Sequence, residues 1–174
     1  MKVVFIRGVL SRYVKNQKNN EIRETFSYGI IYAYSIPLET HQGRLKIGSA
    51  TINHPSPSGE QIKAAACKRI EQQTKTADVA YTLEHAELAL TQKGEYFGDY
   101  DVHQVLLRSG YKRKSENVRN TRSEWFEIDL DKAVKAINAV KEGREALTTA
   151  ERTTALDKPT RPPKPRRRRQ TFLV

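Results

Sequence analysis

Two short runs of strand-forming residues, joined by a connector with a proline and a glycine, constrain the fold of this chain more than any other feature. The runs are residues 29–34 (GIIYAY) and 45–48 (LKIG), and the connector holds Pro37 and Gly43. This spacing predicts a pair of antiparallel strands. Alternation places Ile30, Tyr32 and Tyr34 on one face and Gly29, Ile31 and Ala33 on the other. Taken alone, the pattern also fits a core hairpin whose two tyrosines hydrogen-bond nearby groups.

The same two runs resemble the paired signature of the GIY-YIG endonuclease superfamily. The resemblance rests on Gly29-Ile30-Ile31-Tyr32 and Lys46-Ile47-Gly48 and extends over roughly residues 28–142. It is strongest for a phage- and bacteria-borne branch whose second motif is Lys-Ile-Gly. The resemblance implies hydrolysis of DNA phosphodiester bonds with Mg²⁺ or another divalent cation, with Tyr32 positioning or deprotonating the attacking water. Lys46 stands where the superfamily has a second tyrosine, and we treat it as a candidate electrostatic helper.

A helix is predicted over residues 58–75. Its start signal is either Ser56 with Pro57 or Ser58 with Gln61 three residues later. Apolar residues at a spacing of four define its buried stripe, namely Ile62, Ala66 and Ile70.

Arg69 lies about 20° from Ile62 around this predicted helix, which places it on the apolar side. A guanidinium there needs a partner, because an unpaired buried charge is costly. The partner is either a structural carboxylate or a phosphate, whose oxygens suit the bidentate fork of arginine. The resemblance implies that Arg69 is catalytic and stabilises charge on the scissile phosphate.

Residues 79–91 alternate with one slip at Glu84 and His85, which predicts a bulged strand or, as the alternative, a short helix over 84–92.

A second helix is predicted from Asp99 or Asp101, either of which can cap it, to about Ser109, with Gly110 at its end. His103 lies beside its apolar face. A single histidine in such a place is usually structural or solvated. The related branch has a histidine on this helix, which implies that His103 acts as a helper base.

Residues 124–128 (EWFEI) predict a further strand, and its first residue is a carboxylate. Glu124 shares its parity with Phe126 and Ile128, so alternation places it on the apolar face, with a solvent-facing strand end as the alternative. The related branch carries Glu-Trp-Phe or a close variant here. The resemblance implies that Glu124, with Asp101 as the second choice, holds one Mg²⁺ that acts as a Lewis acid.

Positive charge is unevenly distributed along the chain. Lysines and arginines total 31 against 20 acids, a net charge of +11, which favours an anionic partner such as DNA. Residues 158–174 hold seven bases and no acid, so the first 157 residues carry only +4. A basic loop over 111–122 is either solvated or contacts the DNA backbone, which needs only charge and reach. The candidate DNA-binding residues are Lys112, Arg113, Lys114, Arg119, Arg122, Arg166, Arg167, Arg168 and Arg169.

The predicted architecture is α/β: a small, mainly antiparallel sheet of three or more strands flanked by about three helices, with a basic disordered C-terminal tail. Residues 1–27 are expected to form a strand over 3–6 and a polar connector. Residues 28–147 form the GIY-YIG-like domain, whose last helix starts at Asp129. Residues 148–174 form a Pro/Arg-rich linker or tail. A C-terminal or separate helicase-like module is a candidate partner.

A single cysteine, Cys67, excludes an internal disulfide and suits a reducing compartment. No run approaches the ~20 apolar residues of a membrane span. We therefore expect a cytoplasmic protein without a membrane partner. The predicted function is a metal-dependent DNA endonuclease of phage defence, restriction or mobile-element biology. The alternative is a module of the same fold that binds nucleic acid without cutting it.

Overall fold

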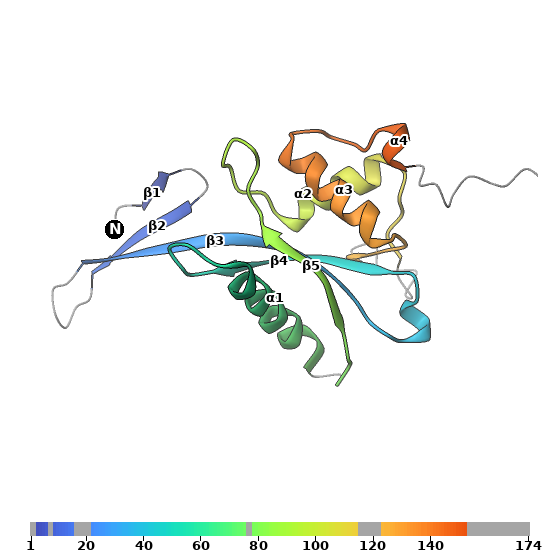
Figure 1. Cartoon of the computed structure of the whole chain (residues 1–174), viewed down its shortest axis with the longest axis horizontal. Coiled ribbons are helices and arrows are strands. Elements are labelled where there is room, and N and C mark those ends of the chain that lie inside the picture. Colours follow the sequence, from blue (N-terminus) through green and yellow to red (C-terminus); the bar gives the residue numbers. More distant parts are fainter. Residues whose placement is uncertain (1–2, 7–8, 16–21, 76–77, 115–122, 153–174) are drawn as a thin grey trace, which may run out of the picture.

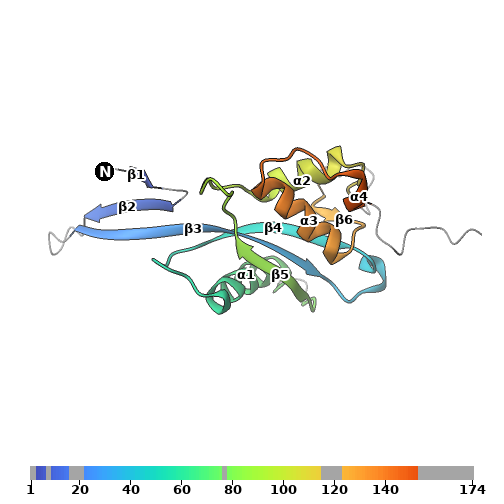
Figure 2. The same ribbon diagram turned by 45° about the horizontal axis from the view of Figure 1, so that its top comes forward.

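The computed structural model describes residues 3–6, 9–15, 22–75, 78–114 and 123–152. It is an α/β fold with a six-stranded antiparallel sheet between helices (Figures 1 and 2). The strands are β1 (Val3–Ile6), β2 (Val9–Lys15), β3 (Ile22–Ser35), β4 (Leu45–Ile52), β5 (Thr82–Leu88) and β6 (Trp125–Phe126). The helices are the 3₁₀ turn η1 (Glu39–His41), α1 (Gly59–Thr74), α2 (Asp99–Arg108), α3 (Leu130–Lys141) and the single turn α4 (Thr149–Arg152).

Strand β3 is the centre of the sheet. Its second half pairs with both β4 and β5, and its first half pairs with β2, which continues the sheet to β1. The short strand β6 pairs with the beginning of β4. Tyr32 lies opposite Gly48 and Tyr34 lies opposite Lys46, so the two signature runs form the antiparallel pair that their spacing predicts.

The alternation along β3 divides the core into two clusters. The three side chains at Ile30, Tyr32 and Tyr34 pack against α1, whose buried stripe contains the predicted Ile62, Ala66 and Ile70. Ile31 and Ala33 pack on the other face, against α2 and α3. The predicted division of β3 into two faces is therefore confirmed, and each face is covered by helix.

Each of the three long helices begins with side-chain capping. At α1, the hydroxyl of Ser58 accepts from the amide of Gln61 at 3.3 Å, and Gln61 Oε1 accepts from the amide of Ser58 at 2.8 Å. This capping box selects the second of the two predicted start signals. Asp101 Oδ2 accepts from the amide of Gly98 before α2, and Asp129 Oδ1 accepts from the amide of Lys132 in α3, both at 2.8 Å.

The polar connector predicted over residues 7–27 is wrong, because β2 and the first half of β3 form a paired ladder there. Leu10 pairs with Ser27 at one end of the ladder, and Lys15 pairs with Ile22 at the other. The ladder bonds are made by the backbone, so polar residues such as Ser11 are compatible with the strand. The polar composition of this segment therefore does not mean that it forms a loop.

The bulged strand is confirmed, and the alternative helix over 84–92 does not form. Ala33 pairs with His85 and Tyr34 pairs with Leu83, which leaves Glu84 as the extra residue of β5. The strand predicted over 124–128 is shorter, since only Trp125 and Phe126 pair with β4. Asp129 already caps α3, so the residues between must turn away from the sheet.

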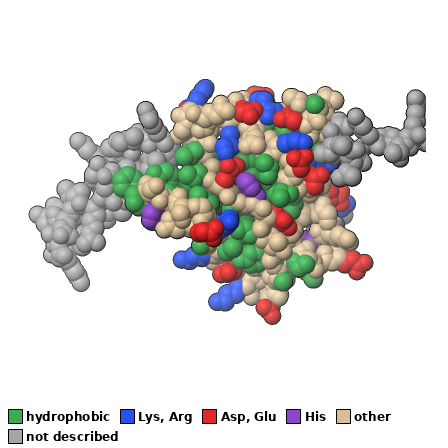
Figure 3. Space-filling model, in the orientation of Figure 1, with side chains coloured by type: hydrophobic (Ala, Val, Ile, Leu, Met, Phe, Trp, Pro, Cys, Tyr) green, Lys and Arg blue, Asp and Glu red, His purple; other side chains and the backbone are tan. Residues whose placement is uncertain are grey.

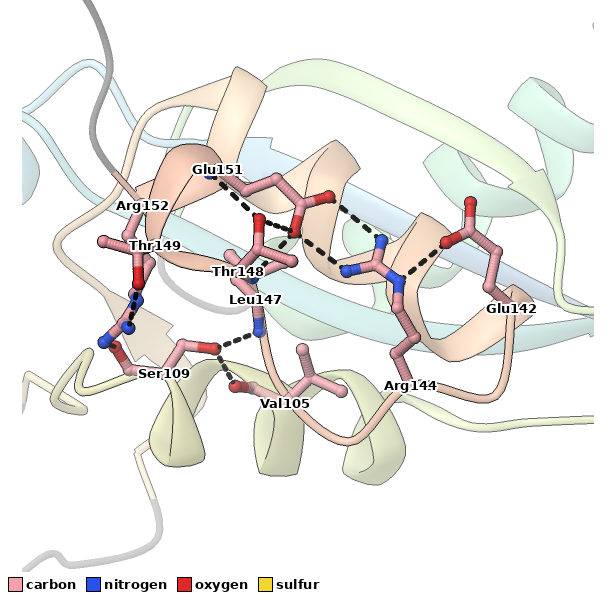
Figure 4. A network of polar contacts seen from close by, with 9 residues as sticks. All are labelled: Val105, Ser109, Glu142, Arg144, Leu147, Thr148, Thr149, Glu151 and Arg152. Carbon is pink, nitrogen blue, oxygen red and sulfur yellow. Dashed lines mark hydrogen bonds and ion pairs between the residues drawn. The ribbon is translucent and has the colours of Figure 1, made fainter.

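A polar network fastens the segment after α3 (Figure 4). The guanidinium of Arg144 donates to both carboxylate oxygens of Glu151, at 2.8 and 3.0 Å. Glu151 also accepts from the amide and the hydroxyl of Thr148. The amide of Leu147 donates to the hydroxyl of Ser109, just beyond α2, at 2.8 Å. These bonds hold α4 against the ends of α2 and α3, so the folded chain continues past residue 147.

This network predicts a specific loss of stability in acid. Hydrogen bonds from Arg144 and Thr148 lower the pKa of Glu151 from 4.5 to about 2. Because the folded pKa lies below the unfolded one, the stabilisation is present above pH 4.5 and is lost as the pH falls towards 2. Glu151→Gln should therefore lower the Tm near neutral pH and reduce its dependence on pH in this window.

The control is Glu145→Gln, because Glu145 makes only an exposed ion pair with Arg108 at 3.5 Å within the described structure. Such pairs contribute little, so this variant should melt like the wild type. Circular dichroism melts across the acid range check both variants. Equal pH profiles for Glu151→Gln and wild type would contradict the assigned role.

Candidate active site

A cleft of about 420 Å³ opens at α1 and the second half of β4, and residues on both faces of that strand line it. Its walls combine small residues of β4 with polar and basic side chains of α1. The residues that line it are Ser49, Ala50, Thr51, Ala65, Lys68, Arg69, Gln72 and Tyr96. Two cations on one wall make this cleft suitable for an anionic group.

The hydroxyl of Tyr32 is buried beside this cleft and has no hydrogen-bond partner among the described residues. Burial raises the pKa of Tyr32 to about 12, against a lowering by the nearby charge of Arg69. Glu124 and Asp99 add to the increase. Tyr32 is therefore a protonated phenol at neutral pH. Buried polar groups are nearly always hydrogen-bonded, so an unpartnered hydroxyl calls for a functional explanation.

Gly48 is a glycine because the ring of Tyr32 lies over it. A Cβ atom at position 48 would lie 2.6 Å from the Tyr32 hydroxyl oxygen and 2.7 Å from Cζ. Real Cβ contacts are essentially never that short. The second signature run thus provides the space that the tyrosine of the first run occupies.

Arg69 faces the cleft and lies near Tyr32, as its place on the apolar side of the helix predicts, but it is exposed rather than buried. Its Nη1 donates to Gln72 Oε1 at 3.4 Å, and its guanidinium lies near enough to the Tyr32 hydroxyl to lower the pKa of Tyr32 without completing a hydrogen bond of regular geometry. Residues four apart on an α-helix are rotated by about 40° beyond one full turn. The buried stripe from Ile62 to Thr74 therefore winds around the helix and away from Arg69. The guanidinium is consequently available at the cleft.

Glu124 pairs with Lys46 rather than with Arg69. Lys46 Nζ lies 3.1 Å from Glu124 Oε2 and donates to Gln73 Oε1 of α1 at 3.0 Å. The same ammonium lies 5.9 Å from the centre of the Tyr34 ring. Glu124 precedes β6 and is outside its pairing, so strand parity does not determine where its carboxylate points. Its side chain is 42% exposed, whereas that of Lys46 is only 16% exposed.

Asp99 is a site residue that the sequence interpretation missed. Its Oδ1 accepts from the hydroxyl of Ser49, a cleft residue, at 3.1 Å, and its charge raises the pKa of Tyr32. The available signal was its spacing of four from His103, which places both on one face of α2. Asp101, the predicted second choice for the metal, instead caps α2 and lines a different cavity, between α2 and the end of α3.

His103 is buried, with 3% of its surface exposed, and does not line the cleft. Its Nε2 lies 3.0 Å from the carbonyl oxygen of Ile47, so this nitrogen carries the proton and donates. Burial lowers the pKa of His103, which keeps the ring neutral. β6 pairs only with Leu45 and Lys46, so it does not reach the carbonyl of Ile47, and His103 donates to that carbonyl instead. His103 therefore holds the signature strand in place.

The predicted DNA-binding residues lie only partly within the described structure. Lys112 and Lys114 are exposed, and Lys114 pairs with Glu127 at 2.7 Å. Arg113 is half-buried, and its Nε has no hydrogen-bond partner among the described residues. Arg119, Arg122 and Arg166 to Arg169 lie outside the described residues. On the face seen in Figure 3, basic and acidic side chains are interspersed rather than separated.

Within the described ranges, no group of three or more His, Cys, Asp and Glu side chains could enclose a metal ion. No helix in the same part of the chain is long and apolar enough to cross a bilayer. Comparison with protein-family models, with curated proteins and with solved structures finds no match.

Proposed function

We propose that this chain is a metal-dependent endonuclease that hydrolyses DNA phosphodiester bonds at the cleft between α1 and β4. The observation that carries the proposal is the hydroxyl of Tyr32, which is buried without a partner in the described structure. A guanidinium and two carboxylates, those of Arg69, Glu124 and Asp99, lie close enough to change its pKa. A donor without an acceptor, beside a cleft with two cations, is complementary to a phosphate and its attacking water.

The side chains of the site have separate roles in this proposal. Arg69 stabilises the charge that develops on the scissile phosphate, for which its fork is suited. Tyr32, protonated near neutral pH, donates a hydrogen bond to a phosphate oxygen or to the attacking water. A cation bound nearby would lower its pKa and so increase the fraction present as phenolate, the form that can accept a proton from the water. Lys46 orients Glu124, and His103 keeps β4 in register with this site.

The donor set fits Mg²⁺ as it is usually bound in phosphoryl-transfer sites. Such ions are held by one or two carboxylates together with waters and substrate phosphates, not by an all-protein cage. Glu124, half-exposed and close to Tyr32, would hold the ion together with waters and phosphate oxygens. When bound, the ion supplies Lewis-acid stabilisation of the phosphate. Asp101 is less suitable, because its carboxylate caps α2.

A second candidate function is a nucleic-acid-binding module that keeps the fold without the chemistry. One observation favours it: the ammonium of Lys46 already pairs with Glu124 at 3.1 Å. The carboxylate best placed for a cation is thereby neutralised. A nuclease acting on intracellular DNA would work in the cytoplasm, in restriction, phage defence or mobile-element biology, alone or with a helicase-like module.

Tyr32→Phe tests the proposal with the smallest change. The hydroxyl has no partner to lose within the described structure, so the variant should melt at or above the wild-type temperature. Cleavage should fall about 10- to 100-fold, since a hydrogen bond to a charged group contributes about 1.5–3 kcal/mol. Tyr34→Phe, the same change two residues along β3, is the matched control and should cut normally. Unchanged cleavage by stable Tyr32→Phe would remove Tyr32 from the site.

A further inference from the structure

Tyr96 is an exposed aromatic residue that the backbone holds at the cleft. Tyr96 is 53% exposed, and it lines the cleft together with Lys68 and Arg69. Tyr96 forms a backbone bridge with Leu90, and the amide of Thr91 donates to the carbonyl of Glu95 at 2.8 Å inside the turn. These bonds fix the backbone at Tyr96 before any ligand arrives.

The Tyr96 ring packs against Gly29, the first residue of the signature, on the sheet face opposite that of Tyr32. A Cβ atom at position 29 would lie 1.8 Å from Cε2 of that ring and 2.3 Å from Cδ2. Gly29 is in a regular part of β3, paired with Thr51, so the strand conformation itself does not require glycine. The requirement comes from the ring. Covering Gly29 needs only apolar bulk, which a leucine supplies, so it does not explain an aromatic residue that stays half-exposed.

The composition of the cleft indicates what the ring is for. Lysine and arginine on α1 suit a phosphate, and a tyrosine at the same cleft suits a planar base. Positive groups that follow the backbone, combined with aromatic rings on which bases stack, are how proteins bind single-stranded nucleic acid. A base inside a duplex is stacked on its neighbours, so it can lie on a protein ring only where the strand is locally unpaired.

We infer that Tyr96 is a stacking platform for an unpaired nucleobase next to the phosphate bound at the cleft. This inference rests on the proposed function and narrows its substrate to single-stranded or locally unpaired DNA. Gly29 then has a binding role, because the absent Cβ is what allows the ring to lie at the cleft.

Binding measured in EDTA tests the platform without cleavage. The probes are a fluorescent single-stranded oligonucleotide and the duplex of the same sequence, with Kd taken from anisotropy. The proteins are the full-length wild type, Tyr96→Phe, Tyr96→Leu and Gly29→Ala. The matched control is Tyr100→Ala, because Tyr100 is 65% exposed but does not line this cleft. A second single strand carries 2-aminopurine, whose fluorescence falls when the base stacks.

Tyr96→Leu should bind the single strand about 5- to 150-fold more weakly, the range that corresponds to one lost stacking contact. Duplex binding should change less, and Tyr96→Phe and Tyr100→Ala should bind like the wild type. Gly29→Ala, which displaces the ring, should resemble Tyr96→Leu and should add nothing to it in the double variant. Melting temperatures identify any variant that loses binding because it unfolds.

The outcomes separate the platform from the nuclease. Equal single-strand affinities for folded Tyr96→Leu and wild type, with cleavage intact, would overturn the platform and leave the proposed function standing. Quenching of 2-aminopurine that depends on Tyr96, in a protein that never cuts, would establish the platform and leave only the binding module. A wild type that binds neither oligonucleotide would overturn both.

Discussion

Arg69→Ala is expected to lower the rate of plasmid nicking about 100- to 1,000-fold while the Tm stays at the wild-type value. The size of the effect is that of removing one donor from a site that stabilises developing negative charge. Stability should not change, because the side chain is exposed and its hydrogen bond to Gln72 is long, at 3.4 Å. Nicking under single-turnover conditions measures the rate, and a thermal melt measures the Tm.

Two variants control for a general loss of positive charge. Lys68→Ala removes the adjacent cation from the same cleft and should reduce nicking about tenfold or less. Arg69→Lys keeps the charge but loses the bidentate fork, so it should recover only part of the rate. If Arg69→Ala and Lys68→Ala were equally impaired, Arg69 would be a simple DNA contact rather than a catalytic residue.

Gly48→Ala is expected to lower cleavage at least as much as Tyr32→Phe does and to cost about 1–3 kcal/mol of folding free energy, as overpacking of a buried site usually does. The new methyl group would lie 2.6 Å from the hydroxyl oxygen of Tyr32, and the tyrosine is fully buried and cannot move into solvent. The hydroxyl would therefore be displaced from Arg69. Denaturant unfolding measures the cost, and plasmid nicking measures the loss of activity.

A double-mutant cycle identifies the contact that is responsible. In a Tyr32→Ala background the ring is absent, so adding Gly48→Ala should cost no further stability. Gly59→Ala is the control for the substitution itself, because nothing lies within 4 Å of a Cβ built at position 59. A Gly48→Ala protein that is as stable and as active as the wild type would contradict the packing of Tyr32 against β4.

Much of the fold could be predicted because its signals are local. The alternation along β3, the capping box of Ser58 and the slip at Glu84 each depend on residues within a few positions of one another. The ladder between β2 and β3 could not be predicted in this way. Its residues are polar in composition, and their pairing joins positions that are up to 17 apart, such as Leu10 and Ser27.

The site was less predictable than the fold, because it depends on which elements meet. The signature indicated Tyr32 and Lys46, but the partner of Glu124 is decided by the position of β6 beside β4. Asp99 enters the site only because α2 places it against Ser49. The exposure of Arg69 follows from the drift of a stripe that extends to Thr74, beyond the three residues used for the prediction.

Nicking of supercoiled plasmid by the wild-type protein, with Mg²⁺ and with EDTA, tests the central claim most directly when DNA binding is measured in the same samples. We expect relaxed circles with Mg²⁺, none with EDTA, and DNA binding under both conditions. A single-stranded substrate is included, because the Tyr96 platform favours unpaired DNA. Protein that binds DNA with either addition but cuts neither substrate with Mg²⁺ or Mn²⁺ would contradict the account and establish a binding module instead.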